Sequence, residues 1–130
     1  MQRWLMLILI LFVIGGISIF TFRKMVQEVD RQFIKDAVMT ASLEIHSQVA
    51  DFDGDQIATF DFEEIFLDHH EASVSPVWID SEGRPTDVWG KHFRVTFDSD
   101  SPIKWVECAS AGRDKKFGTA DDIAHRSNGL

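Results

Sequence analysis

Residues near the N-terminus are almost all apolar, and this pattern predicts a helix that crosses a membrane. The stretch from Trp4 to Phe22 contains no charged residue. At about 1.5 Å of rise per residue, such a helix reaches nearly across a hydrocarbon core of about 30 Å. A cleaved signal peptide is the competing interpretation, but no small-x-small cleavage site follows the apolar run. We therefore expect an uncleaved anchor over residues 1–24.

Beyond Lys24, apolar positions recur at helical spacing and charged residues fall between them. This pattern predicts that the helix continues over residues 25–50, so that one helix runs from about Gln2 to about Ala50. We expect the second half of its apolar stripe to pack against a core. The stripe consists of Val26, Val29, Phe33, Ala37, Ala41, Ile45 and Val49, widened by Ile34 and Val38.

The remaining patterns are shorter and predict an α+β domain over residues 25–130. The segment 51–55 breaks the long helix, and a short helix is expected from Asp61 to His69. From Val77 onward, alternating apolar positions and turn residues indicate strands. We expect about three antiparallel strands in a meander against the amphipathic helix. The expected strands cover residues 77–79, 92–97 and 103–109, with turns at 81–85 and 98–102.

Charge separates the anchor from the rest of the chain. Residues 1–24 carry +3, and the remaining 10 basic and 21 acidic residues give −11. An acidic domain repels phosphate backbones, so we expect no nucleic-acid partner, whereas cations and basic protein surfaces suit it. Arg23 and Lys24, counted alone, would favour a cytoplasmic side for the domain. Cys108 is the single cysteine, and its apolar neighbours predict a buried thiol.

A glycine-bearing stretch from Ser110 to Ile123 gathers carboxylates at its two ends. Calcium takes about six to eight oxygen ligands from carboxylates, hydroxyls and backbone carbonyls. A loop that closes on itself can supply them, which predicts a calcium site. The alternative is a solvated acidic turn that neighbouring lysines partly neutralise. The candidate ligands are Asp114, Asp121 and Asp122, with help from Ser110, Thr119 or nearby carbonyls.

Other polar clusters give weaker signals. Asp51, Asp53 and Asp55 resemble the start of an EF-hand loop, but Gln56 stands where that loop needs glycine. Turn chemistry and helix capping explain these aspartates better. The histidines, including His69, His70, His92 and His125, are expected on the surface because no metal-binding spacing supports them. No nucleophile elbow or phosphate loop is present, so we do not expect an enzyme.

Two motifs in the C-terminal half resemble a known family. Asp87-Val-Trp-Gly90 is followed by an expected strand, by Ser110-Ala-Gly-Arg-Asp114 and by Phe117-Gly-Thr-Ala-Asp-Asp-Ile123. This order is similar to the C-terminal half of the major pseudopilin family of bacterial type II secretion. The resemblance covers most of the chain in architecture, and specific motifs from Asp87 to Ile123.

The resemblance implies a type IV pilin-like fold in the bacterial inner membrane, with the C-terminal domain in the periplasm. It implies partner subunits of the same kind, stacked through their N-terminal helices into a filament, and a C-terminal loop that binds calcium. The calcium role carries over to Asp114, Asp121, Asp122 and Ser110. One departure matters, because the family has a basic leader and a glutamate within the apolar segment, whereas no acid precedes Glu28 here. A membrane-tethered calcium-binding or adaptor protein that does not polymerise is therefore the alternative.

Overall fold

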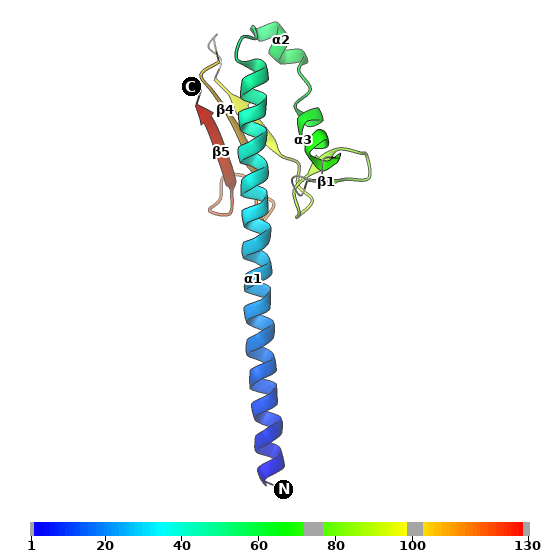
Figure 1. Ribbon diagram of the computed structural model, residues 1–130, viewed down its shortest axis with the longest axis vertical. Coiled ribbons are helices and arrows are strands. Elements are labelled where there is room, and N and C mark those ends of the chain that lie inside the picture. Colours follow the sequence, from blue (N-terminus) through cyan, green and yellow to red (C-terminus); the bar gives the residue numbers. More distant parts are fainter. Residues whose placement is uncertain (1, 72–76, 99–102, 129–130) are drawn as a thin grey trace. The chain divides into compact units, whose positions relative to one another are not determined.

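The computed structural model describes residues 2–71, 77–98 and 103–128, apart from the side chains of Gln2, His70 and Glu71. It contains two compact units, Met1–Asp30 and Arg31–Leu130. The first helix, α1 (Gln2–Val49), contributes to both (Figure 1). Its bounds confirm the long helix expected from Gln2 to about Ala50.

In the first unit, α1 leaves its apolar side chains uncovered. The large hydrophobic residues from Trp4 to Phe22 are between 52% and 82% exposed. A core helix of a water-soluble protein would bury such residues. This part of the chain is therefore a helix that is long and apolar enough to span a membrane.

In the second unit, two antiparallel sheets replace the single expected meander. Strands β3 (Arg94–Phe97), β4 (Trp105–Ser110) and β5 (Ile123–Asn128) form one sheet in that order, and β1 (Trp78–Ile79) pairs with β2 (Pro85–Thr86) in the other. The expectation of three antiparallel strands is correct, but their membership is wrong. The strand near Trp78 lies in the small sheet, and β5 supplies the third strand of the larger one. The turn expected at 98–102 lies largely outside the described residues.

The second half of the apolar stripe of α1 packs in the core, as expected. Its fully buried members are Ile34, Ala37, Val38, Ala41, Ile45 and Val49. Val106 and Cys108 of β4 are also fully buried and belong to the same cluster as most of these residues. This confirms the buried thiol, and burial raises the pKa of Cys108 to about 12.

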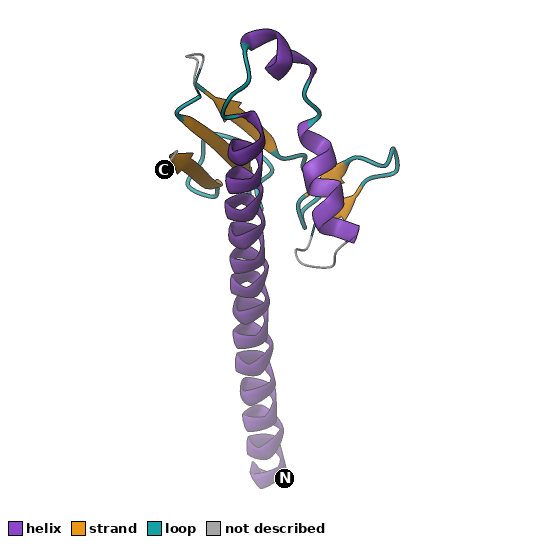
Figure 2. Ribbon diagram, turned by 45° about the horizontal axis from the view of Figure 1, so that its top comes forward, coloured by secondary structure: helices purple, strands orange, loops and turns teal. Residues whose placement is uncertain are grey.

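Two short helices follow α1. Helix α2 (Gly54–Thr59) was not expected, and α3 (Phe62–Glu71) confirms the helix predicted from Asp61 to His69. Figure 2 shows α3 beside the β1–β2 sheet. Phe60 and Phe62 at the α2–α3 junction contact each other edge to face at 5.1 Å, and Phe62 stacks on Phe97 at 5.9 Å. These rings join the helical segment to the end of β3.

Strand β5 meets α1 through polar side chains. Ser42 Oγ and His125 Nδ1 are 2.7 Å apart, and His46 Nδ1 and Ser127 Oγ are also 2.7 Å apart. The Nε2–H of His46 donates to the Ile103 carbonyl, because a carbonyl can only accept. Both ring nitrogens of His46 therefore have a partner. Buried polar groups need such partners to offset their desolvation.

Candidate metal centre

The predicted carboxylates lie in the loop between β4 and β5, and backbone N–H groups hold each of them. Asp114 Oδ1 accepts from Lys116 N at 2.9 Å, and Asp121 Oδ2 accepts from Asp114 N at 3.1 Å. Asp122 Oδ2 accepts from Gly118 N at 2.8 Å. These hydrogen bonds join the two ends of the loop, so the loop closes on itself through its own aspartates, Asp114, Asp121 and Asp122.

One oxygen in this loop is buried without a partner. Asp122 Oδ1 finds no hydrogen bond among the residues that the structure describes. A buried, unpaired carboxylate oxygen is unfavourable, and a hard cation is one group that satisfies it. The carboxylate oxygens of this loop therefore fit calcium by their chemistry. Within the described ranges, however, no three His, Cys, Asp or Glu side chains converge as a metal cluster, so carbonyl and water oxygens would have to complete the shell.

Hydrogen bonds also favour the charged form of Asp114. The N–H of Lys116, followed by the Thr119 hydroxyl, holds the pKa of Asp114 below its usual value. The Thr119 hydroxyl also lies 3.2 Å from the Lys116 carbonyl, so its single proton has two acceptors in reach. Asp114 is exposed at the surface, and it stays available as an anion at neutral pH.

The structure separates Ser110 from these carboxylates. Ser110 ends β4, is fully buried, and donates its hydroxyl to Asp87 Oδ2 at 2.6 Å. Its Oγ also accepts from Gly112 N at 3.1 Å. The hydroxyl therefore links the Asp87 turn to the start of the acidic loop, a link that the spacing of the two motifs did not indicate.

Asp87 is a buried carboxylate held mainly by its own turn. Its Oδ1 accepts from Trp89 N at 3.0 Å and from Lys91 N at 2.9 Å. Its backbone N–H donates to the Lys91 carbonyl, and its carbonyl accepts from Gly90 N. Asp87 is 0% exposed, and these donors, together with Ser110, take the place of the water that it has lost.

Seven residues earlier, the turn at Asp80 has the same hydrogen bonds. Asp80 Oδ1 accepts from Glu82 N and Arg84 N, both at 2.9 Å. Its backbone N–H donates to the Arg84 carbonyl, and Gly83 N donates to the Asp80 carbonyl. The pattern Asp-x-x-Gly-basic occurs in the sequence at 80–84 and again at 87–91. This repeat is the sequence signal that could have identified Asp87 as a turn residue.

Aromatic packing covers the outer face of the sheet near the acidic loop. The Arg94 guanidinium lies 4.2 Å from the centroid of the Phe117 ring. Arg94 pairs with Ala109 in the β3–β4 ladder, and Ala109 is 1% exposed. This cation–π contact ties the tip of the loop to β3.

One aspartate of the acidic cluster at 51–55 caps a helix, although the helix itself was not expected. Asp53 Oδ1 accepts from Gln56 N at 2.9 Å, and Gln56 Oε1 accepts from Asp53 N at 3.0 Å. This reciprocal pair is a capping box at the start of α2. The expectation of local capping is therefore confirmed for Asp53.

The surface placement expected for the histidines is wrong for His69. Its ring is buried, and its Nε2–H donates to Glu44 Oε2 at 2.6 Å. Helical position alone did not show that α3 turns this residue toward α1. His125 and His92 are partly buried, bound to Ser42 and to Asp80 respectively. The side chain of His70 lies outside the described part of the structure.

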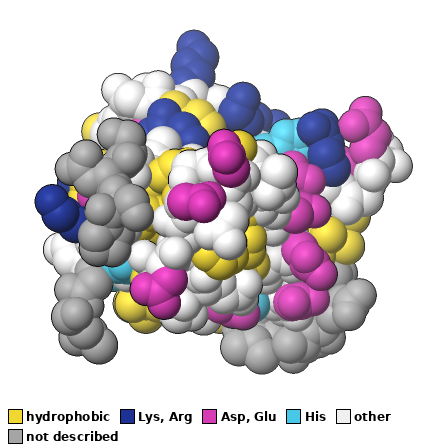
Figure 3. Space-filling model, turned by 90° about the horizontal axis from the view of Figure 1, so that it is seen from above, with side chains coloured by type: hydrophobic (Ala, Val, Ile, Leu, Met, Phe, Trp, Pro, Cys, Tyr) yellow, Lys and Arg dark blue, Asp and Glu magenta, His cyan; other side chains and the backbone are white. Residues whose placement is uncertain are grey.

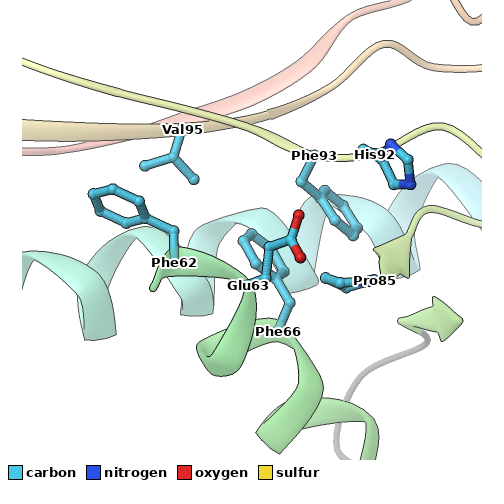
Figure 4. Close-up of a pocket in the computed structure, with 7 residues that line it drawn as sticks. All are labelled: Phe62, Glu63, Phe66, Pro85, His92, Phe93 and Val95. Atoms are coloured by element: carbon cyan, nitrogen blue, oxygen red, sulfur yellow. The ribbon is translucent and has the colours of Figure 1, made fainter. Parts of the chain in front are cut away.

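A cavity of about 230 Å³ lies between α3 and the start of β3 (Figure 4). Phe66 and Phe93 stack at 4.4 Å in its wall. Glu63 and His92 supply its polar groups, and His92 already binds Asp80 at 2.7 Å. The volume is below the roughly 300–1,000 Å³ of small-molecule sites.

Acidic side chains spread over the face of the molecule seen from above, and most of the Lys and Arg side chains visible in this view gather toward one edge (Figure 3).

No protein-family model matches this chain, and neither a curated protein nor a solved structure matches it. Its own motifs and their geometry are therefore what support a function.

Proposed function

We propose that this chain is a pseudopilin-like structural subunit of a type II secretion or pilus-type machine. The observation that carries the proposal is the hydrogen bond between Asp87 and Ser110. Asp87 opens one motif of the family resemblance and Ser110 opens the next. Two motifs that lie apart in the sequence thus form one buried structure, which chance resemblance of short loops does not require.

The N-terminal helix has the properties of an anchor for such a subunit. Its apolar residues from Trp4 to Phe22 are uncovered, and the same helix, α1, continues to Val49. We propose that it lies in the bacterial inner membrane, with the C-terminal domain in the periplasm. Other pseudopilin subunits, including further copies of this chain in a filament, would be its partners, and the acidic domain disfavours nucleic acid.

The loop between β4 and β5 is the proposed calcium site of this subunit. Asp114, Asp121 and Asp122 would hold the ion, and the unpaired Asp122 Oδ1 is the oxygen that most needs it. Ser110 supports the loop through Asp87 instead of serving as a ligand. A bound calcium ion would supply positive charge between carboxylates that otherwise repel one another.

Calcium-dependent melting of the full chain in detergent micelles tests this proposal. Binding to the folded state at 100 times the dissociation constant adds about 2.7 kcal/mol, which raises the melting temperature of a domain this small by about 10 °C or more. Asp122→Asn keeps the shape of the side chain and should remove most of the rise, and magnesium is the matched ion control. An equal response to calcium and chelator would contradict the calcium loop.

A membrane-tethered calcium-binding or adaptor protein that does not polymerise is the second candidate. It is favoured by the lack of any acid between Met1 and Gln27. The family's glutamate in this segment assists assembly, so its absence removes one attraction between neighbouring helices. Cross-linking of the full chain in membranes separates the two candidates. Ladders of many subunits support the structural subunit, and a chain that stays monomeric supports the tethered protein.

A further inference from the structure

Asp87 is a completely buried carboxylate. Its nearest described polar partners are the N–H groups of Trp89 and Lys91 and the hydroxyl of Ser110. No ion pair joins it to a residue within the described ranges. Such a buried carboxylate depends on the direction of each donor, because a donor that turns away leaves it unsatisfied.

The hydroxyl of Ser110 has one proton, and Asp87 fixes where that proton points. A carboxylate can only accept, so Ser110 Oγ donates to Asp87 Oδ2 at 2.6 Å. A lone pair of the same oxygen is then free to accept from Gly112 N at 3.1 Å. The Ser110 hydroxyl thereby links Asp87 to Gly112, because it donates to the first and accepts from the second.

Gly112 in turn fixes the far side of the acidic loop. Its φ is +71°, and a Cβ at this position would overlap the Asp121 carbonyl oxygen. The backbone of Asp121 therefore lies directly against the Cα of Gly112. Asp121 and Asp122 are adjacent, so displacement of Gly112 moves both candidate ligands.

We propose that Asp87 is a positioning residue for the acidic loop, acting through Ser110 and Gly112 to place Asp121 and Asp122 for calcium. This inference rests on the calcium loop of the proposed function. Asp87 contacts no candidate ligand itself. Its effect passes through one hydroxyl and one backbone N–H, because Asp87 Oδ2 accepts the Ser110 hydroxyl and thereby orients the oxygen that accepts from Gly112.

Asp87→Asn in the full chain in detergent micelles tests the inference, with Asp80→Asn as the matched control. Both asparagines keep an oxygen for the N–H groups of their own turn. At position 87 the new amide nitrogen stands in place of Oδ2 and cannot accept the Ser110 hydroxyl, so the hydroxyl must turn away and its oxygen shifts relative to Gly112 N. We expect calcium affinity, measured by titration calorimetry, to fall by about tenfold or more in Asp87→Asn, as for other residues that support metal ligands. Asp80→Asn should bind as the wild type does.

Amide hydrogen exchange at Gly112 supplies a readout that does not depend on calcium. Exchange should quicken in Asp87→Asn and in Ser110→Ala, which keeps Asp87 but removes the hydroxyl, and should not change in Asp80→Asn. Ser110→Ala also covers the case in which Asp87→Asn fails to fold. Wild-type calcium affinity and unchanged Gly112 exchange in both variants would overturn the inference. A wild-type chain that binds no calcium would instead overturn the calcium loop of the proposed function.

Discussion

The turns at Asp80 and Asp87 share the same backbone hydrogen bonds but lie in different surroundings. Each aspartate accepts two N–H groups through Oδ1, and each turn has a glycine with φ near +80°, at +81° in Gly83 and +83° in Gly90. The side chain of Asp80 is 24% exposed, whereas Asp87 is fully buried. The second carboxylate oxygen is where they differ.

In the exposed turn, that oxygen faces a histidine and an arginine. Asp80 Oδ2 lies 2.7 Å from His92 Nε2 and 3.6 Å from Arg84 Nε. In the buried turn it accepts the Ser110 hydroxyl. The comparison teaches that an Asp-x-x-Gly turn forms from local chemistry alone, and that the remaining oxygen decides whether the turn closes a hairpin or supports a distant loop.

The largest expected difference between the two turns is in stability. Asp87→Ala leaves one buried and two partly buried donors without an acceptor, so we expect it to lower the free energy of unfolding by about 3–5 kcal/mol. Asp80→Ala leaves groups that water can reach, and its effect should be much smaller. Thermal melting of both variants in detergent micelles measures the difference.

Thiol labelling gives an independent check on the same pair. Cys108 lies in β4, two residues before Ser110, and burial keeps it as a slow-reacting thiol. Asp87→Ala should speed its reaction with a maleimide, whereas Asp80→Ala should not. Equal losses of stability in the two variants would show that burial of Asp87 does not matter.

The glycines of the two turns should respond alike. No atom lies within 4 Å of a Cβ added at Gly83 or Gly90, so alanine meets strain only in the backbone. We expect Gly83→Ala and Gly90→Ala each to destabilise the protein by about 1–2 kcal/mol, the strain of a left-handed residue. A much larger loss at Gly90, seen by the same melting measurement, would mean that the turns are not equivalent.

The smallest expected effect is the acid sensitivity of the exposed turn. Its hydrogen bond from His92, then the Arg84 N–H, lowers the pKa of Asp80 to about 2. A lowered pKa stabilises the fold above the unfolded value of 3.8, and this contribution disappears as the pH falls toward 2. The melting difference between wild type and Asp80→Asn should therefore shrink between pH 4 and pH 2. A constant difference would show that the charge of Asp80 contributes nothing.

Features with strong apolar periodicity could be predicted from the sequence. The stripe from Ala37 to Val49 indicates a packed helix because helical spacing and burial coincide there. Strand β5 could not be recognised, since its inward positions His125 and Ser127 are polar. Ser127 is buried and His125 partly buried where α1 offers His46 and Ser42 as hydrogen-bond partners. Helix α2 buries only Ile57, and a helix of this length has no periodicity to detect.

The residue types of the candidate site could be predicted from the sequence, but the hydrogen bond between Asp87 and Ser110 beside it could not. Asp114, Asp121 and Asp122 lie in one loop that closes on itself, as their composition suggested. The burial of Asp87 depends on Ser110, 23 residues later, and no local pattern carries such a pairing. Ser110 was grouped with the carboxylates from the composition of the loop and again from the resemblance, whereas the fold gives its hydroxyl to Asp87.

The polar pairs between α1 and β5 also bear on how the chain is made. Ser42 and His125 are 83 residues apart, and His46 and Ser127 are 81 residues apart. At about 5–20 residues per second, His125 is synthesised roughly 4–17 s after Ser42. During that interval the buried face of α1 has neither its hydrogen-bond partners nor the β5 strand that closes the core. A nascent chain released before Ile123 is therefore left with a long, uncovered helical face that associates readily with membranes or with other incomplete chains.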